Sequence, residues 1–220
     1  PQAVVTTSVQ QALENKSDGR ISIFFGLENG SAIGDSLDEL RRFYEAGVRY
    51  VTLCHSGNNQ ICDSCASKVK RWNGLSPFGK EVVAQMNSMG MLIDVSHISD
   101  DAFYDVISLS TKPVVATHSC CRALADHPRN LTDDMIRKLA DTGGVIQVNF
   151  YPVFLDSDFR STLNDSGIMV RGESVESEFI ADPADSSKRA AWNAVQDELN
   201  ALERPSFRRI VDHIDHIVGL

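Results

Sequence analysis

The chain has 220 residues, of which 42% are hydrophobic and 23% charged, and its formal net charge is −9. This composition is typical of a globular protein that can form a hydrophobic core. The negative charge and the lack of a basic cluster argue against a nucleic-acid partner, because nucleic-acid phosphates would repel such a surface. No stretch approaches the roughly 20 apolar residues of a transmembrane helix. We therefore expect a soluble chain, and its compartment stays open between the cytoplasm and the space outside it.

Short apolar runs alternate with amphipathic segments along the first 150 residues. The apolar runs predict strands at residues 21–27, 50–53, 91–95, 113–117 and 145–150. The segments between them predict helices at residues 36–46, 77–89, 99–109 and 132–143. Because the strands are continuously apolar, the pattern is typical of a parallel sheet covered on both faces. The sequence thus predicts an α/β fold.

The pattern changes after Phe150. Residues 151 to about 185 are polar and acidic, and we expect an irregular excursion there, with a lid or a dimer contact as open alternatives. A charged helix is predicted over residues 187–202, and Arg204-Pro205 introduces a last amphipathic helix. We expect residues 1–220 to form one domain.

The chain contains five cysteines, and Cys62 and Cys65 have the spacing of a redox or zinc pair. No second such pair completes a structural zinc site with four ligands. The pair therefore indicates either a local disulfide or two free thiols.

Glu28, His55, His97 and His118 follow four successive predicted strands. In a parallel barrel the carboxyl ends of all strands lie on one face, where catalytic and metal-binding residues gather. A single histidine at a strand end is more often a structural residue than a ligand, but four such positions in succession favour a site. Two histidines and one glutamate form a known ligand set of hydrolytic zinc. A metal held there would lower the pKa of bound water to about 7.

Several motifs of the chain resemble the membrane (renal-type) dipeptidase family, peptidase family M19, a branch of the metal-dependent amidohydrolase barrels. The motifs are Gly26-Leu-Glu-Asn-Gly30, Tyr50-Val-Thr-Leu-Cys-His-Ser-Gly-Asn-Asn59, Leu92-Ile-Asp-Val-Ser-His97, Pro113-Val-Val-Ala-Thr-His-Ser119, Arg129-Asn130, Asn149-Phe-Tyr151 and Asp212-His-Ile-Asp-His216. They cover nearly the whole chain in order. The resemblance implies a TIM-type (β/α)8 barrel with two zinc ions at the strand ends.

The resemblance also implies roles for single residues. Glu28 would bridge the two metals, and His97 and His118 would complete the ligands of one of them. His55 would polarise the scissile carbonyl and stabilise the tetrahedral oxyanion. Arg129 would hold the terminal carboxylate of the substrate, a bidentate contact that suits arginine, although from the residues alone a surface salt bridge would be preferred. Tyr151 would line the pocket.

Two features of the family pattern are not in their places. One is a His-x-Asp on the first strand, which supplies ligands to the other metal. The second is an Asp on the last strand. The only His-x-Asp is His213-Ile-Asp215, inside a predicted helix. There we expect Ile210, Ile214 and Ile217 to face the core, and His213, Asp215 and His216 to form a polar flank. The chain therefore resembles an internal portion of the barrel, about strands 3 to 7, with a full ligand set for one metal.

The sequence predicts a zinc-dependent dipeptidase that acts through a metal-activated hydroxide. One alternative is a metal-dependent hydrolase of another amide or of a lactone. Another is a non-catalytic remnant of a barrel. Manganese or cobalt could occupy the same ligands. The expected partner is a small dipeptide, and a homodimer remains possible.

Overall fold

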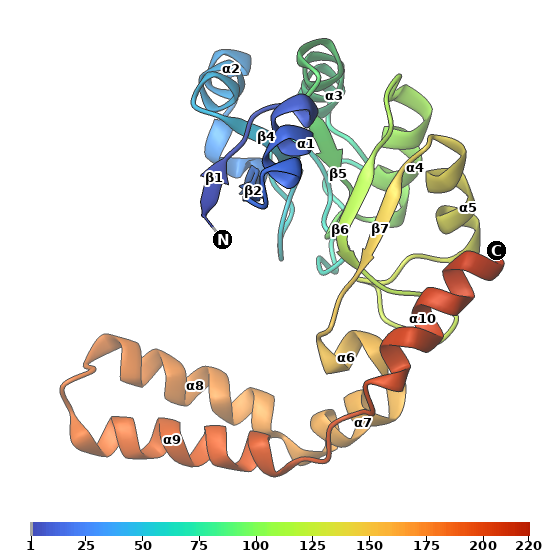
Figure 1. The fold of residues 1–220 in the computed structure, drawn as a ribbon. Helices are drawn as coiled ribbons and strands as arrows, with labels where there is room; N and C mark the ends of the chain where they lie inside the picture. Colours follow the sequence, from blue (N-terminus) through green and yellow to red (C-terminus); the bar gives the residue numbers. More distant parts are fainter. Residues whose placement is uncertain (1) are drawn as a thin grey trace.

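The computed structural model describes residues 2–220 and contains a sheet of five parallel strands (Figure 1). In their order across the sheet the strands are β3 (Phe25–Glu28), β4 (Val48–Thr52), β5 (Leu92–Asp94), β6 (Val115–Ser119) and β7 (Val145–Val148). The predicted parallel α/β arrangement is confirmed. β3 and β7 are the outer strands of this sheet in the described part of the chain. The closed (β/α)8 barrel therefore stays a prediction.

Four helices alternate with these strands, as the sequence predicts. They are α2 (Leu37–Glu45), α3 (Pro77–Met89), α4 (Asp100–Leu109) and α5 (Asp133–Asp141). Each begins after a serine or threonine whose side chain accepts a hydrogen bond from the first turn, which satisfies a backbone N–H that has no partner in the helix. A short 3-10 helix, η1 (Gly30–Ile33), directly follows β3.

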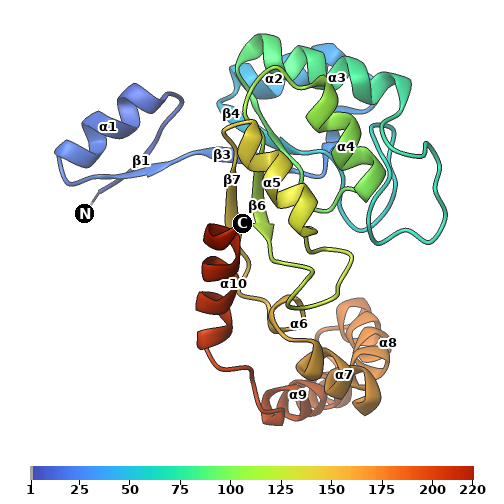
Figure 2. The same ribbon diagram turned by 90° about the vertical axis from the view of Figure 1, so that its right-hand side faces the viewer.

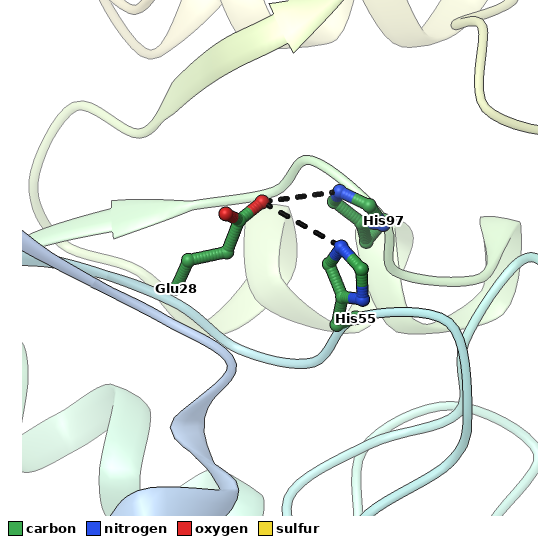
Figure 3. Close-up of side chains that lie close together, drawn as sticks. All are labelled: Glu28, His55 and His97. Carbon is green, nitrogen blue, oxygen red and sulfur yellow. Dashed lines mark ion pairs between the residues drawn. The ribbon is translucent and has the colours of Figure 1, made fainter. Parts of the chain in front are cut away.

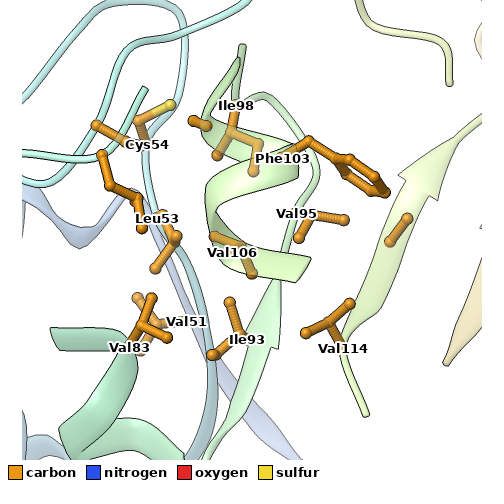
Figure 4. Close-up of a cluster of buried hydrophobic side chains, with 14 of the residues drawn as sticks. Val51, Leu53, Cys54, Val83, Ile93, Val95, Ile98, Phe103, Val106 and Val114 are labelled. Carbon is orange, nitrogen blue, oxygen red and sulfur yellow. The ribbon is translucent and has the colours of Figure 1, made fainter. Parts of the chain in front are cut away.

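The main core lies between one face of the sheet and these helices (Figure 4). Val51 and Ile93 of the sheet pack there with Val83 of α3 and Val106 of α4, and all four are at most 2% exposed. The opposite face is more open, since Leu92 is 47% exposed. The prediction of a sheet covered on both faces is therefore wrong within residues 2–220. Continuous apolar strands do not distinguish a sheet covered on both faces from one that helices cover on a single face.

The first described residues form a separate small unit that the apolar pattern does not predict. It consists of β1 (Ala3–Val5), α1 (Val9–Ser17) and β2 (Ile21–Ile23), with β1 and β2 paired in parallel. Figure 2 shows this unit projecting from the five-stranded sheet. The predicted strand at 21–27 is thus divided at Phe24, and its two halves belong to different sheets.

The segment after β7 is helical, so the predicted irregular excursion at 151–185 is wrong. It contains α6 (Pro152–Leu155), α7 (Ser157–Ser166) and α8 (Ile168–Ala181), and the predicted charged helix follows as α9 (Ser186–Ala201). α8 and α9 run side by side as a hairpin below the sheet in Figure 1. A small second core holds these helices together: Phe159, Leu163, Ile168 and Val195.

The last helix, α10 (Arg208–Gly219), forms as predicted, but its faces differ from the prediction. His213 is completely buried: its Nδ1 accepts a hydrogen bond from the backbone N–H of Cys121 at 3.0 Å, and Nε2 donates one to the carbonyl of Leu155 at 3.1 Å. Ile214, which we placed in the core, is 44% exposed. His213 therefore connects α10 to the backbone of Cys121 and Leu155 and is not part of a polar flank.

All five cysteines are free thiols, so Cys62 and Cys65 do not form the local disulfide that was one alternative. Within residues 2–220, no helix combines the length and apolar character that crossing a membrane requires.

Candidate metal centre and its surroundings

Three polar residues lie in one row at the carboxyl ends of neighbouring strands. The register pairs Glu28 of β3 with Thr52 of β4, and Thr52 with Asp94 of β5. Gly26 allows β3 to lie close to the ring of Tyr50, because a Cβ atom at position 26 would stand 1.9 Å from Cζ of Tyr50. This close approach helps to fix the position of Glu28, which ends β3.

The side chains of three histidines converge on one oxygen of Glu28. Oε1 of Glu28 lies 3.2 Å from Nε2 of His118, 3.4 Å from Nε2 of His97 and 3.9 Å from Nε2 of His55. Figure 3 shows Glu28, His55 and His97 pointing toward one another. The Nε2 atoms of His97 and His118 are 2.8 Å apart. The structure thus brings together the four residues that the sequence places at successive strand ends.

The loop after β4 carries His55 and is held by its own polar residues. Asn59 donates to the carbonyl of Leu53 at 2.7 Å and accepts from the backbone N–H of Ile61 at 2.8 Å. The carboxylate of Asp63 accepts hydrogen bonds from three backbone N–H groups, those of Arg71, Trp72 and Gly74. The His55 side chain is 46% exposed, and its Nδ1 lies 3.0 Å from the hydroxyl of Ser56. His55 is therefore the most accessible of the three histidines.

His97 occupies an unusual backbone conformation. Its φ is +72°, in the left-handed region that costs a non-glycine residue energy. The carbonyl of His97 accepts a hydrogen bond from the backbone N–H of Cys65 at 2.9 Å, which helps to hold this conformation. Burial, reinforced by the nearby Arg129 and the other two histidines, lowers the pKa of His97 to about 3. The ring is neutral at pH 7 and can offer a lone pair to a metal.

His118 is held at both its backbone and its ring. Its backbone N–H donates to Oγ of Ser96 at 3.1 Å, and its Nδ1 lies 2.7 Å from Oγ1 of Thr117. Burial and Arg129 lower the pKa of His118, against the opposing effect of Asp94 and Glu28. His118 is therefore also a neutral ring, with Nε2 directed toward Glu28.

Asp94, at the end of β5, is completely buried. Its Oδ2 accepts hydrogen bonds from the hydroxyls of Thr52 and Thr117, both at 2.6 Å. Its Oδ1 accepts from the backbone N–H groups of Ser96 at 2.9 Å and Thr117 at 3.0 Å. Asp94 is not among the predicted site residues, although a single acidic residue inside the apolar run at 91–95 indicates a buried carboxyl group that requires partners.

Arg129 is 7% exposed and lies next to the histidines. Its Nη2 donates to the carbonyl of His118 at 3.0 Å, and its guanidinium lies 5.4 Å from the ring centre of Phe154. Among residues 2–220, no carboxylate lies within ion-pair distance of Arg129, and burial lowers the pKa of its guanidinium. The surface salt bridge that the residues alone would favour is thus wrong.

Tyr151 is 44% exposed and follows β7. Its ring packs edge-on against Phe154 at a centroid distance of 5.1 Å. It also lines a cavity of about 170 Å³ with residues of the α8–α9 hairpin, among them Trp192 and Leu199. Its part in a substrate pocket stays a prediction.

The donors around Glu28 suit a metal ion. Ligand atoms of Glu28, His55 and His97 lie within 4.8 Å of one another. Nε2 of His118 lies as close to Glu28 and His97, at 3.2 Å and 2.8 Å. The contact between His97 and His118 requires either a proton on one of the two nitrogens or a cation between the donors. Two neutral imidazoles and a carboxylate are a ligand set of zinc. His213 and Asp215, the only His-x-Asp of the sequence, lie in α10 and do not join this group.

Comparisons with known proteins identify the family of this chain. The family model "Membrane dipeptidase (Peptidase family M19)" matches residues 1–220. A dipeptidase of Aspergillus oryzae is 40% identical over 138 residues, which are 63% of this chain and 33% of that protein. An uncharacterized dipeptidase of Schizosaccharomyces pombe is 37% identical over 156 residues, which are 69% of this chain and 37% of that protein. The chain thus spans about a third of the length of these curated relatives.

Two solved structures resemble the fold. The probable dipeptidase PvdM from Pseudomonas aeruginosa has a TM-score of 0.79 and 27% identity, and the match covers 99% of this chain and 59% of that one. A metallo peptidase from Rhodobacter sphaeroides, liganded with a phosphinate mimic of the dipeptide L-Ala-D-Ala, has a TM-score of 0.66 and 30% identity. That match covers 71% of this chain and 46% of the other. Since the family model spans the whole chain, this protein belongs to the membrane dipeptidase family, peptidase family M19.

Proposed function

We propose that this protein is a zinc-dependent dipeptidase, with the metal held by Glu28, His97 and His118. The convergence of the His97 and His118 rings on Oε1 of Glu28 supports the ligand set. His118 is favoured over His55 as the ligand because it lies closer to Glu28, at 3.2 Å against 3.9 Å, and because its side chain is less exposed. A zinc ion held there would lower the pKa of water and polarise a carbonyl group.

His55 is proposed to orient the scissile carbonyl of the substrate. Its exposed position beside Glu28 leaves Nε2 free to approach a substrate oxygen. When Nε2 carries a proton, it can donate a hydrogen bond to the oxygen that becomes negatively charged in the tetrahedral transition state. Ser56, at 3.0 Å from Nδ1, can accept or donate there and so supports either ring tautomer.

The single observation that carries the substrate assignment is the buried Arg129. A buried cation is costly unless an anion pairs with it, and no carboxylate of residues 2–220 does so. The guanidinium lies next to His118, so a substrate carboxylate could reach it from the histidine cluster. This supports a peptide with a free C-terminus over a lactone or a neutral amide. The dipeptide mimic bound to the related metallo peptidase from Rhodobacter sphaeroides supports the same class of substrate.

The test is zinc-dependent hydrolysis of a dipeptide such as L-Ala-D-Ala. We expect bound zinc, loss of activity after treatment with a chelator, and recovery when zinc is returned. Manganese and cobalt added to the metal-free protein would show whether other ions support the reaction. Zinc binding without dipeptide hydrolysis would contradict the dipeptidase assignment, and failure to bind any metal would contradict the whole proposal.

A further inference from the structure

We propose that Asp94 is a positioning residue for the metal site, and that it acts through the hydroxyl of Thr117 to fix the ring tautomer of His118. The fixed tautomer carries its proton on Nδ1 and leaves the lone pair of Nε2 facing Glu28 and His97. This inference rests on the proposed function, because it concerns a residue proposed to bind the metal. It adds Asp94 and Thr117 to the residues on which that site depends.

The buried carboxyl group of Asp94 is surrounded by donors only. Oδ1 accepts two backbone N–H groups, and Oδ2 faces the hydroxyls of Thr52 and Thr117. No basic side chain of residues 2–220 forms an ion pair with Asp94. A carboxylate in this setting requires both hydroxyls to donate to it, since hydrogen bonds are then its only compensation for burial.

The hydroxyl of Thr117 has one proton and two neighbours. Its Oγ1 lies 2.6 Å from Oδ2 of Asp94 and 2.7 Å from Nδ1 of His118. When the hydroxyl proton points to Asp94, Oγ1 can only accept from His118. Nδ1 must then carry the ring proton, and Nε2 is left unprotonated, 3.2 Å from Oε1 of Glu28.

The hydroxyl of Thr117 alone would not select one tautomer of His118. An isolated hydroxyl can donate to Nδ1 or accept from it, so both tautomers of the ring would be permitted. Asp94 prevents donation to Nδ1, because the hydroxyl of Thr117 donates its hydrogen bond to the carboxylate instead. Metal-binding histidines are commonly oriented by a carboxylate or a carbonyl on the nitrogen away from the metal, and here the carboxylate acts through an intervening hydroxyl.

The backbone of His118 is tied to the same carboxyl group. Ser96 donates its N–H to Oδ1 of Asp94 at 2.9 Å and accepts the N–H of His118 on its Oγ at 3.1 Å. Hydrogen bonds through Thr117 and Ser96 therefore connect both the ring and the main chain of His118 to Asp94. They fix the direction of Nε2 as well as its protonation.

Asp94→Asn tests the proposal most sharply, because it should reverse the hydrogen-bond chain. The two backbone N–H groups keep the amide oxygen at the Oδ1 position, so the amide NH₂ faces Thr52 and Thr117. That NH₂ donates to Oγ1 of Thr117, whose proton then turns to Nδ1 of His118. We expect His118 of the zinc-free full chain to change from the Nδ1-protonated to the Nε2-protonated tautomer, as read from its ¹⁵N chemical shifts.

Thr52→Val is the matched control. Thr52 is 1% exposed, and its hydroxyl donates to the same Oδ2 atom at 2.6 Å, but it forms no hydrogen bond with His118. We expect the His118 tautomer to stay as in the wild type. The same change of tautomer in Thr52→Val would overturn the proposal. The loss of any hydrogen bond to Asp94 would then be enough to change the tautomer, whether or not it leads to His118. An Nε2-protonated His118 in the wild type would overturn it without any variant.

Zinc binding by the full chain provides the second measurement. Removal of such an orienting partner weakens metal binding by about 10- to 100-fold, and we expect this for Thr117→Val. Thr117→Ser keeps the hydroxyl and should restore the affinity. Unchanged affinity and tautomer in Thr117→Val would overturn the inference while the proposed function stands. If the wild type shows the expected tautomer but binds no zinc, the proposed function is contradicted and the inference about the tautomer stands.

Discussion

Nε2 of His118 lies 3.2 Å from Oε1 of Glu28, although β6 and β3 are separated in the sheet by β4 and β5. The contact exists because parallel strands place their carboxyl ends on one side, where side chains from separate strands can meet. The central claim about this protein, a metal site at that end of the sheet, depends on this contact.

His118→Ala should abolish zinc binding and, with it, hydrolysis. The substitution removes one of three proposed ligands, and the two that remain make a weak site. Zinc per chain, measured by atomic absorption after dialysis, and dipeptide turnover are the readouts. His216→Ala is the control, because His216 contacts Asp133 at 2.8 Å away from the site. Normal zinc content in His118→Ala would mean that His118 is not a ligand.

Arg129→Met should weaken the hydrolysis of a dipeptide more than that of the corresponding dipeptide amide. The amide lacks the carboxylate that Arg129 is proposed to bind. A hydrogen bond to a charged group contributes about 1.5–3 kcal/mol, so kcat/KM for the free dipeptide should fall by roughly 10- to 100-fold. An equal loss for both substrates would show that Arg129 supports the site only structurally, through the carbonyl of His118.

Gly26→Ala should destabilise the protein. The added Cβ would lie 1.9 Å from Cζ of Tyr50, so β3 or the ring must move. Overpacking of this kind costs about 1–3 kcal/mol. The urea midpoint of unfolding measures the loss, and Gly57→Ala, where nothing lies within 4 Å of the new Cβ, is the control. Equal midpoints for the two variants would contradict the close packing of β3 on Tyr50.

The metal-free protein should lose stability as the pH falls from about 6.5 toward 4. Burial, together with Arg160, Arg129 and Arg122, lowers the pKa of His127 to about 4. The unfolded chain therefore binds more protons than the folded one in this range, and the stability present above the ordinary histidine pKa is lost as the pH decreases. His213, whose pKa burial also lowers, acts in the same direction.

Urea midpoints at pH 7 and pH 5, with a chelator present, check this expectation. His127→Asn should reduce the difference between the two midpoints, because asparagine does not titrate. The reduction should be larger than the one caused by a change that adds no titratable group at an exposed position, such as Asn164→Gln. A wild-type midpoint that is the same at both pH values would contradict the assigned pKa directions.

Much of the site could be predicted from the sequence, because strand ends are readable from apolar runs. Glu28 ends β3, His118 lies in β6, and His55 and His97 follow β4 and β5 by three residues. Parallel topology then brings them together without any knowledge of side-chain packing.

The buried hydrogen-bond partners could not be predicted in the same way. Thr52 and Thr117 are ordinary strand residues, and only the register of β4 with β5 aligns Thr52 with Asp94. The division at Phe24 is equally hidden, since an uninterrupted apolar run gives no sign that its halves join different sheets.

His213 shows a further limit of helical periodicity. Ile210, Ile214 and Ile217 have the spacing of a buried face, but the helix turns His213 inward, where Cys121 and Leu155 satisfy both ring nitrogens. A polar residue can replace an apolar one in a core when each of its polar atoms has a partner. Those partners lie far away in the sequence, so only the folded chain reveals them.

The most direct test of the metal site is a crystal of the protein grown with zinc, with anomalous scattering recorded at the zinc absorption edge. We expect a peak at about 2.0–2.2 Å from Nε2 of His97, Nε2 of His118 and a carboxylate oxygen of Glu28. A zinc ion bound by His55 in place of His118, or no peak among these side chains, would contradict the account.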